Sequence, residues 1–435
     1  MTPLRAAVGV FFTAGWLVPA CTSVDVDPGA PPATQDASVP PAAGEDANVP
    51  EAGGEHDAGA PPRLEVACEK DPCYVAVSGN GGLHFCGLLK DGTVRCWGRD
   101  TMYTEPASPD GAAAPTDGAL GRGTAVSLLE GATPAPVVGL EGVTQISVGP
   151  NLGTCARKGD GSVLCWGRNE FGQLGQAATE ATLPVPTRIA GLPPVDYVAL
   201  GRSTGCAIGS ADHALYCWGR RDGVIGGATD AGIDPSTFPP QLMPHFPPPV
   251  RALAIGSSAD ADTIMALLDG GGLATLGSQP VGESSVVPSL PLPLTIPGVV
   301  RLGVFAYLDH AGLLQRWYPR TGELYVPSPA SVVDVSISSV DGQGGALLSN
   351  GRLFRWGPNA RGTLGSSPDA LPLAEHPLEM KHVAGDRVVS FATTRGSTCA
   401  SRVDGTIRCW GANLRGELGR GSVDALAHPE SEVIR

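Results

Sequence analysis

The stretch CWGRNEFGQLG at residues 165–175 decides the fold, and it recurs as CWGANLRGELG at residues 409–419. A third copy, WGPNARGTLG at residues 356–365, keeps the same register without a cysteine. Shortened or interrupted copies follow Trp97 and Trp218. A motif that recurs several times in one chain indicates an architecture built by repetition.

Extending this register along the chain gives seven positions for the tryptophan of the motif. These positions are Trp97, Trp166, Trp218, Leu276, Trp317, Trp356 and Trp410. An apolar alternating strand such as Ile146-Ser147-Val148 precedes each of them, and over residues 64–435 the unit averages about 53 residues. Because no such unit can bury a core of its own, the units must pack on one another. The pattern predicts the blades of a β-propeller, with the tryptophans as core wedges between blades.

The composition agrees with an all-β chain. The 435 residues include 60 glycines and 41 prolines, which break helices, so a coiled coil or a long-helix protein is excluded. Apolar residues make up 42% of the chain and aromatic residues 5%, so the core must consist mainly of aliphatic side chains in short strands. The net charge of −14 opposes attraction to phosphates, and we expect no nucleic-acid partner.

Eight cysteines form local pairs that flank turns. The pairs are Cys86 with Cys96, Cys155 with Cys165, Cys206 with Cys217, and Cys399 with Cys409. In three of them an Asp-Gly turn lies at the midpoint, at Asp91, Asp160 or Asp404. A three-residue hairpin loop with a left-handed glycine would place the two cysteines opposite each other across the strands. We predict a disulfide for each pair, and a fifth between Cys68 and Cys73.

Zinc binding and reduced core thiols are the alternatives for these cysteines. A zinc site needs closely spaced ligand pairs such as C-x-x-C, and the sequence has none. Reduced thiols would be expected if the chain stayed in a reducing compartment. We therefore predict structural cysteines, with neither a metal nor another cofactor.

The N-terminal residues have the pattern of a targeting signal. Residues 1–20 carry one early cation, Arg5, then an apolar stretch and small residues before Cys21, as in a secretory signal peptide. LVPAC at residues 17–21 resembles a bacterial lipoprotein processing site, in which the cysteine is lipidated. The alternatives are secretion without lipid and a membrane span, for which the apolar stretch is short. We predict a lipoprotein of the cell envelope, at the outer membrane or cell surface, held to the membrane by its N-terminal lipid alone.

An acidic segment, which we call the tether, separates this targeting signal from the repeats. Residues 21–62 contain eight acidic residues and no Lys or Arg, and they are rich in Pro, Ala and Gly. With almost no large apolar side chain to offset the entropy of ordering, such a segment is typical of disorder. The predicted domains are thus a signal peptide at 1–20, a disordered tether at 21–63 and a propeller at 64–435.

The repeats resemble those of the regulator of chromosome condensation family. That repeat runs approximately from a Val-rich strand through a D-G turn to W-G-x-N-x-x-G-Q-L-G and a later P-x-x-V, and residues 166–175 match it best. The resemblance implies seven four-stranded blades closed into a ring. It also implies that HPESEVI at residues 428–434 completes a blade whose remainder lies near residues 74–98, so that the two chain ends share one blade.

The known activities of this family cannot be assigned to particular residues of this sequence. The founding member is a nucleotide-exchange factor on chromatin, and no motif lets its exchange residues be placed here. A plant ultraviolet receptor of the family needs clustered tryptophans, whereas the six in this body lie roughly one per blade. Secreted bacterial β-lactamase inhibitors of the family clamp another protein with one face of the propeller, and an inhibitor of a secreted enzyme is therefore one alternative.

Catalytic motifs are weak, and we predict no catalytic residue. Residues 201–205 match G-x-S-x-G in letters, but they occupy the same repeat position as residues 149–153 and lack a strand-to-helix context. The eight histidines include no H-E-x-x-H motif. Asp260-Ala261-Asp262 offers too few oxygen ligands for a calcium loop.

We expect a monomeric binding protein that recognises an envelope or extracellular protein, or an envelope polymer. Insertions at residues 99–137, 220–249 and 278–297 are the candidate contact surface, with solvent-exposed filler as the other interpretation. A polysaccharide-acting enzyme is the rival class, with loop carboxylates such as Asp222 and Asp230. A purely structural envelope component is a third possibility.

Overall fold

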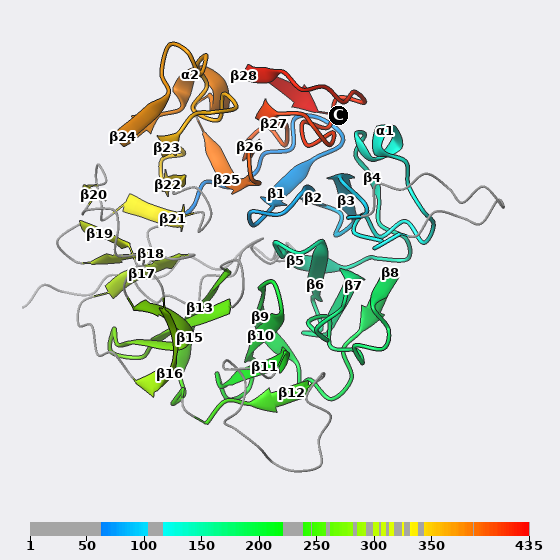
Figure 1. Ribbon diagram of the computed structural model, residues 1–435, viewed down its shortest axis with the longest axis vertical. Helices are drawn as coiled ribbons and strands as arrows, with labels where there is room; N and C mark the ends of the chain where they lie inside the picture. Colours follow the sequence, from blue (N-terminus) through cyan, green and yellow to red (C-terminus); the bar gives the residue numbers. More distant parts are fainter. Residues whose placement is uncertain are drawn as a thin grey trace, which may run out of the picture. The chain divides into compact units, whose positions relative to one another are not determined.

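The computed structural model is a seven-bladed propeller, as the repeats predicted. It describes residues 62–102, 116–220, 238–244, 246–257, 262–281, 285–292, 299–303, 306–309, 313–316, 324–325, 331–337, 343–385 and 387–434. Seven antiparallel sheets of four strands each surround one axis (Figure 1). Within every blade the strands pair in sequence order from the axis outward.

The blades follow one another along the chain. Blade one contains β1 (Tyr74–Ser78), β2 (His84–Leu89), β3 (Val94–Gly98) and β4 (Ala135–Pro136), blade two β5 (Val143–Val148), β6 (Gly153–Lys158), β7 (Val163–Arg168) and β8 (Thr182–Arg188), and blade three β9 (Val195–Leu200), β10 (Thr204–Gly209), β11 (Leu215–Gly219) and β12 (Phe238–Leu242). Blade four contains β13 (Val250–Ser257), β14 (Asp262–Leu268), β15 (Leu273–Val281) and β16 (Ser285–Leu292), and blade five β17 (Val299–Gly303), β18 (Ala306–Asp309), β19 (Leu313–Arg316) and β20 (Leu324–Tyr325). Blade six contains β21 (Val332–Ile337), β22 (Gly344–Leu348), β23 (Leu353–Pro358) and β24 (Leu373–Glu379), and blade seven β25 (Val388–Thr393), β26 (Ser397–Arg402), β27 (Ile407–Ala412) and β28 (Ala427–Ile434). Two short helices, α1 (Leu128–Gly131) and α2 (Lys381–Ala384), lie in connections between strands.

The Asp-Gly turns form as predicted. At the turn between β2 and β3, the Gly92 N–H donates to the Leu89 carbonyl at 3.0 Å and Gly92 takes a φ of +79°. Asp91 Oδ1 accepts hydrogen bonds from the backbone N–H of Thr93 at 2.9 Å and from its hydroxyl at 2.7 Å. Since a left-handed φ costs glycine little, Asp-Gly fixes the register of the hairpin.

This register places the cysteines opposite each other, and all five predicted disulfides are present. The Cα–Cα distance is 4.1 Å for Cys86–Cys96, Cys155–Cys165, Cys206–Cys217 and Cys399–Cys409, and 5.3 Å for Cys68–Cys73. The four hairpin disulfides lie in blades seven, one, two and three, which are neighbours in the ring.

The tryptophans are wedges between blades, and four of them also make the same hydrogen bond. Each indole N–H donates to the carbonyl of the residue before the leucine in the G-x-L-G motif of the preceding blade. The bonds are Trp97 to Glu417 (2.9 Å), Trp166 to Ala119 (3.1 Å), Trp218 to Gln173 (2.8 Å) and Trp410 to Thr363 (2.8 Å). These four and Trp356 have no exposed surface, and Leu276 is also buried. Trp317 lies outside the described residues.

The ring closes without the predicted strand exchange, so that prediction is wrong. β28 pairs with β27 in blade seven, and all four strands of blade one come from the N-terminal part of the chain. We call the junction of blade one with blade seven, where the ring closes, the seam. The Trp97–Glu417 bond joins these two blades by the same contact that joins other neighbouring blades. The Ser390 hydroxyl also accepts the Val77 N–H at 2.9 Å across this seam.

A strap at residues 62–73 reinforces the seam. Its Ala67 and Glu69 N–H groups, with that of Tyr74 just beyond it, donate to the carbonyls of Val403, Asp404 and Gly405, at 2.6, 3.2 and 2.8 Å. A Cβ on Gly405 would lie 2.9 Å from Cys73 Sγ, so a larger residue would push the strap away. The folded body therefore begins slightly before residue 64, because Arg63 already contacts blade six.

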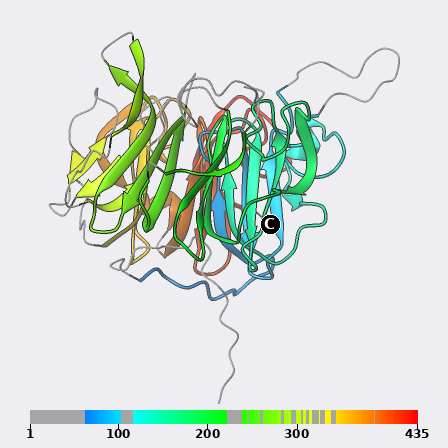
Figure 2. The same cartoon turned by 90° about the horizontal axis from the view of Figure 1, so that it is seen from below.

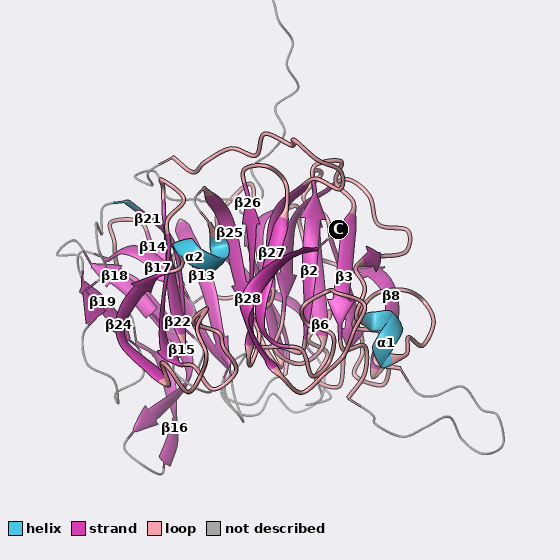
Figure 3. Cartoon of the chain, turned by 90° about the horizontal axis from the view of Figure 1, so that it is seen from above, coloured by secondary structure: helices cyan, strands magenta, loops and turns pink. Residues whose placement is uncertain are grey.

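The strap distinguishes the two faces of the ring. We call the face that carries the strap and the β2–β3-type turns the lower face, and the opposite face the upper face (Figure 2). Where they are described, the first and third connections of the blades lie on the upper face. There the paired backbone of β15 and β16 extends beyond the neighbouring blades (Figures 2 and 3). Among the described residues, no helix is long and apolar enough to cross a membrane.

Candidate functional site

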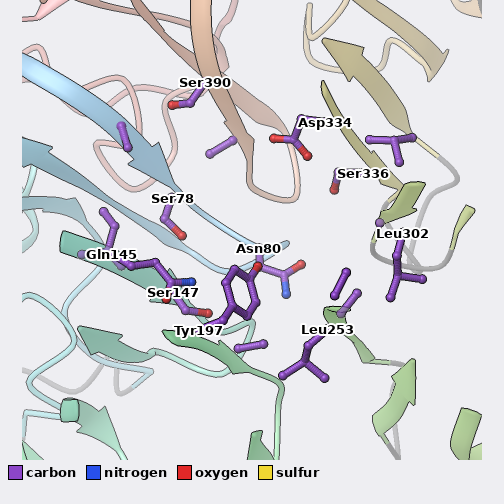
Figure 4. Close-up of a pocket in the computed structure, with 18 of the residues that line it drawn as sticks. Ser78, Asn80, Gln145, Ser147, Tyr197, Leu253, Leu302, Asp334, Ser336 and Ser390 are labelled. Carbon is purple, nitrogen blue, oxygen red and sulfur yellow. The ribbon is translucent and has the colours of Figure 1, made fainter. Parts of the chain in front are cut away.

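The innermost strands converge on a cavity of about 290 Å³ at the axis of the ring (Figure 4). Two corresponding positions of each strand contribute to its lining. The position nearer the lower face is Ala76, Gln145, Tyr197, Ala252, Arg301, Asp334 or Ser390, and the one nearer the upper face is Ser78, Ser147, Ala199, Ala254, Gly303, Ser336 or Ala392. No side chain of the second set is larger than serine, which lets the seven strands approach one another.

Several of these side chains join one inner strand to the next. The Ser78 hydroxyl accepts the Val148 N–H at 3.0 Å, and the Ser147 hydroxyl accepts the Leu200 N–H at 3.0 Å. Gln145 acts as a substitute peptide group, since it donates to the Val198 carbonyl at 2.9 Å and accepts the Val198 N–H at 3.0 Å. Such bonds satisfy backbone groups that an edge strand would otherwise leave unpaired.

Charged and aromatic groups gather toward the lower end of the cavity. A guanidinium N–H of Arg63 donates to the Val333 carbonyl at 2.9 Å. Burial raises the pKa of Asp334, while the nearby Arg63 and Arg301 guanidinium groups oppose that shift. Burial and the nearby Asp334 carboxylate raise the pKa of Tyr197 to about 12, so its hydroxyl stays protonated at neutral pH.

The sequence did not predict Arg63, Tyr197 or Asp334 as functional residues. The available signal was the inner-strand pattern: large polar residues recur at one position of strands that otherwise carry aliphatic residues. That pattern could have predicted that these residues lie near the axis. It could not have predicted that they lie close enough to one another for their charges to interact.

Ser203 of the G-x-S-x-G match has a structural partner. Its hydroxyl and its N–H both donate to Asp262 Oδ2, at 3.0 and 2.8 Å, and the Arg202 N–H donates to Asp262 Oδ1 at 3.0 Å. The buried Asp262 carboxylate thus joins blade four to the first connection of blade three. The Ser257 hydroxyl donates a fourth hydrogen bond to this carboxylate, at 2.5 Å. A carboxylate that accepts four hydrogen bonds joins structural elements and does not activate a serine.

Histidines and acidic residues form no ligand cluster in the part of the chain that is described. His84 is fully buried, and one ring nitrogen lies 2.8 Å from the Thr154 hydroxyl. Burial lowers the pKa of His84 to about 4, so the ring is neutral near pH 7. Asp222, Asp230 and Asp260 lie outside the described residues, as does Cys21.

The described parts of the three insertions lie on the upper face or at its rim. The first, at 99–137, includes α1 and packs against blade seven, where the Gly421 N–H donates to the Ala132 carbonyl at 2.9 Å. The second, at 220–249, is described mainly through β12, which pairs with β11. The third, at 278–297, is an extension of the β15–β16 hairpin from Gly277 opposite Ser289 to Val281 opposite Ser285. The described parts of the first and third insertions are therefore ordered elements of the blades.

Comparison with known proteins agrees with this geometry. A family model of the regulator of chromosome condensation (RCC1) repeat matches residues 160–208, and a second model of the same repeat matches residues 74–103 and 143–173. The chain carries regulator of chromosome condensation repeats. The matched segments cover β1–β3 of blade one and run from β5 of blade two into β10 of blade three.

Known proteins with similar sequences differ widely in length. The human E3 ubiquitin-protein ligase HERC2 is 25% identical over 286 residues, which cover 63% of this chain and 5% of HERC2. The ultraviolet-B receptor UVR8 of Arabidopsis thaliana is 23% identical over 383 residues, which cover 81% of this chain and 80% of UVR8. The chain thus spans a small fraction of HERC2 but most of UVR8.

Among solved structures, Prp20p of Saccharomyces cerevisiae has a TM-score of 0.59 and 17% identity. The match covers 85% of this chain and 90% of Prp20p, whose structure was described with its binding to Gsp1p and histones. At this identity the likeness shows the shared propeller fold.

Proposed function

We propose that the chain is a protein-binding propeller of the cell envelope, anchored by a lipid at Cys21, whose partner binds the upper face. The observation that carries this proposal is the asymmetry between the two faces. The strap, which continues the segment that follows Cys21, lies against the lower face, whereas the described parts of the third connections lie on the upper face. An anchored propeller would therefore meet its partner with the upper face.

The disulfides support a place outside the cytoplasm. Disulfides persist in oxidising compartments and are rare where glutathione and thioredoxin keep thiols reduced. Ten cysteines lie in five pairs with the spacing of disulfides. Protein binding is supported by the fold shared with Prp20p, which was described with its binding to Gsp1p and histones.

Site-specific crosslinking in the source cells would test the partner surface. A photo-crosslinking amino acid would replace Arg361 or Arg395 on the upper face, and Lys90 or Asn350 on lower-face turns as matched controls; all four residues are exposed. We expect a single crosslinked protein from the upper positions and none from the lower ones. Equal crosslinking from both faces, or from the lower face alone, would contradict the proposal.

The anchor needs its own test. Cells fed a labelled fatty acid should label the wild-type protein, and a Cys21→Ala variant should carry no label and leave the membrane fraction. An unlabelled wild type that still sediments with membranes would contradict lipidation at Cys21. It would leave the crosslinking result unaffected.

A further inference from the structure

The Cys68–Cys73 disulfide differs from the other four in what surrounds it. The cysteines of the hairpin disulfides have no exposed surface, and each pair lies between hydrogen-bonded strands of one sheet. Cys68 is half-buried, and Cys73 keeps 6% of its surface exposed, in the strap outside the sheets. Among the disulfides of the described residues, Cys68–Cys73 is therefore the one that a dissolved thiol can reach without opening a blade.

The two ends of this disulfide are not equally accessible. A Cβ on Gly405 would lie 2.9 Å from Cys73 Sγ, which shows how closely the turn between β26 and β27 covers that atom. The Cys73 carbonyl also accepts the Lys90 N–H at 3.0 Å, so Cys73 is held by blades one and seven. Cys68 is the more exposed residue, and an attacking thiolate meets its sulfur first.

The backbone of Cys68 is strained. Its φ of +52° lies in the left-handed region, which a residue with a Cβ adopts only at a cost in energy. The disulfide to Cys73 holds Cys68 in this conformation, together with the hydrogen bonds that the Ala67 and Glu69 N–H groups donate to carbonyls of blade seven. Breaking the disulfide removes one of these restraints, so Cys68 can return to an extended conformation and draw Ala67 and Glu69 away from blade seven.

We propose that Cys68–Cys73 is a thiol–disulfide exchange site that controls the strap, and that its reductant is a dithiol. One thiolate of the dithiol attacks Cys68 Sγ and forms a new S–S bond, and Cys73 leaves as a thiolate that takes up a proton. The second thiolate of the dithiol then attacks the first sulfur of the dithiol, so that Cys68 also leaves and takes up a proton. Two electrons pass to the strap, the dithiol becomes a disulfide, and the hairpin disulfides stay oxidised.

Reduction would change how the folded body is joined to the tether. The strap is held against the lower face by its bonds to blade seven and by the bond from Arg63 to the Val333 carbonyl of blade six (Figure 2). Without the bonds of Ala67 and Glu69, that part of the strap moves with the tether, and the seam keeps only the direct contacts between blades one and seven. The partner surface proposed on the upper face is not involved, so this inference and the proposed function can fail separately.

Graded reduction of the full chain tests the site. The protein would be incubated with increasing concentrations of dithiothreitol, its free thiols alkylated, and each cysteine followed by peptide mass spectrometry. We expect Cys68 and Cys73 to be labelled at least about tenfold faster than any hairpin cysteine. Hydrogen exchange at the Ala67 and Glu69 amides should rise in step with this labelling, whereas the Lys90 amide, which is bonded to the Cys73 carbonyl, should keep its protection.

Two glycine variants tie the reduction to the contact with Cys73. Gly405→Ala places a methyl group against Cys73 Sγ and should speed reduction of Cys68–Cys73. Gly92→Ala is the matched control, because Gly92 takes a φ of +79° in the equivalent turn of blade one, where a Cβ would meet Gly142 instead.

Equal labelling of the strap and hairpin cysteines, or strap amides whose exchange does not change on reduction, would overturn the proposal. The wild-type comparison decides between these outcomes even where Gly405→Ala does not fold.

Discussion

At the residue scale, one asparagine of the repeat holds the third connection in place in blades two, six and seven. Asn169 Nδ2 lies within 3.2 Å of the carbonyls of Gln176, Ala177 and Glu180, and Asn169 Oδ1 accepts the Leu174 N–H at 2.9 Å. In blades six and seven, Asn359 Nδ2 donates to the Leu371 carbonyl and Asn413 Nδ2 to the Ser422 carbonyl, and their Oδ1 atoms accept the N–H groups of Leu364 and Leu418. In blade one the position is Asp100, which faces donors: its oxygens accept the Leu120 N–H and the Thr116 hydroxyl.

This difference predicts unequal effects of exchanging the two residue types. Asn169→Asp removes the donors and turns a carboxylate toward three carbonyls, so we expect the free energy of unfolding to fall by about 2–3 kcal/mol. Asp100→Asn should cost less, about 1 kcal/mol, because an amide oxygen can still accept one of the two bonds. Urea denaturation of both variants beside the wild type measures the difference. Equal losses would show that the side-chain pattern does not set stability here.

His84 predicts a pH-dependent stability. Its pKa is lowered to about 4 in the folded state, against about 6.5 in an unfolded chain, so the unfolded state binds the extra proton first. The contribution of His84 is therefore complete above pH 6.5, falls as the pH drops toward 4, and amounts to about 3 kcal/mol. His84→Gln should flatten this part of the stability profile relative to the wild type. Parallel profiles between pH 7 and 4 would refute the assignment.

At the scale of the element, the disulfide-linked hairpin is the element that could be predicted best from the sequence. Asp160 Oδ1 accepts the Ser162 N–H at 2.9 Å, and the opposed cysteines of the same hairpin, Cys155 and Cys165, are fully buried. Asp-Gly turns and cysteine spacing are local, so turn type, register and pairing could all be predicted. The Cys68–Cys73 pair differs, because it lies in the strap and closes a loop outside the sheets.

Removing the two kinds of disulfide should have different consequences. The double variant Cys155→Ala with Cys165→Ala should lose about 2–3 kcal/mol of unfolding free energy, because the unfolded chain regains the entropy of a closed loop. Cys68→Ala with Cys73→Ala should instead speed amide exchange at Ala67 and Glu69 and leave the exchange within blade two unchanged. Calorimetry and hydrogen exchange would distinguish them. Faster exchange in blade two after loss of the strap disulfide would contradict this division.

At the scale of the whole molecule, closure of the ring was the part that the sequence could not predict. The expected exchange of the C-terminal strand rested on family resemblance, whereas the strap reinforces the seam through backbone groups of residues far apart in sequence, such as Tyr74 and Gly405. Backbone bonds leave no side-chain signature. The cavity residues Arg63, Tyr197 and Asp334 were missed for a related reason, since they come together from the strap and two distant blades.

The seam predicts the result of shortening the chain. Removing residues 427–435 deletes β28, so amides of β27 should lose their protection from hydrogen exchange. The strands β1 to β3 should keep their protection, because Trp97 and Val77 bind residues that the shortened chain retains. Loss of protection throughout blade one would instead indicate that the two chain ends share a blade.

Mass spectrometry of the protein isolated from its own cells would test the extracytoplasmic, disulfide-stapled ring most directly. Peptides prepared without reduction should contain Cys68–Cys73, Cys86–Cys96, Cys155–Cys165, Cys206–Cys217 and Cys399–Cys409, and the first peptide should begin at a lipid-modified Cys21. Free thiols at the hairpin cysteines, with an unprocessed N-terminus, would contradict both the proposed compartment and the anchor.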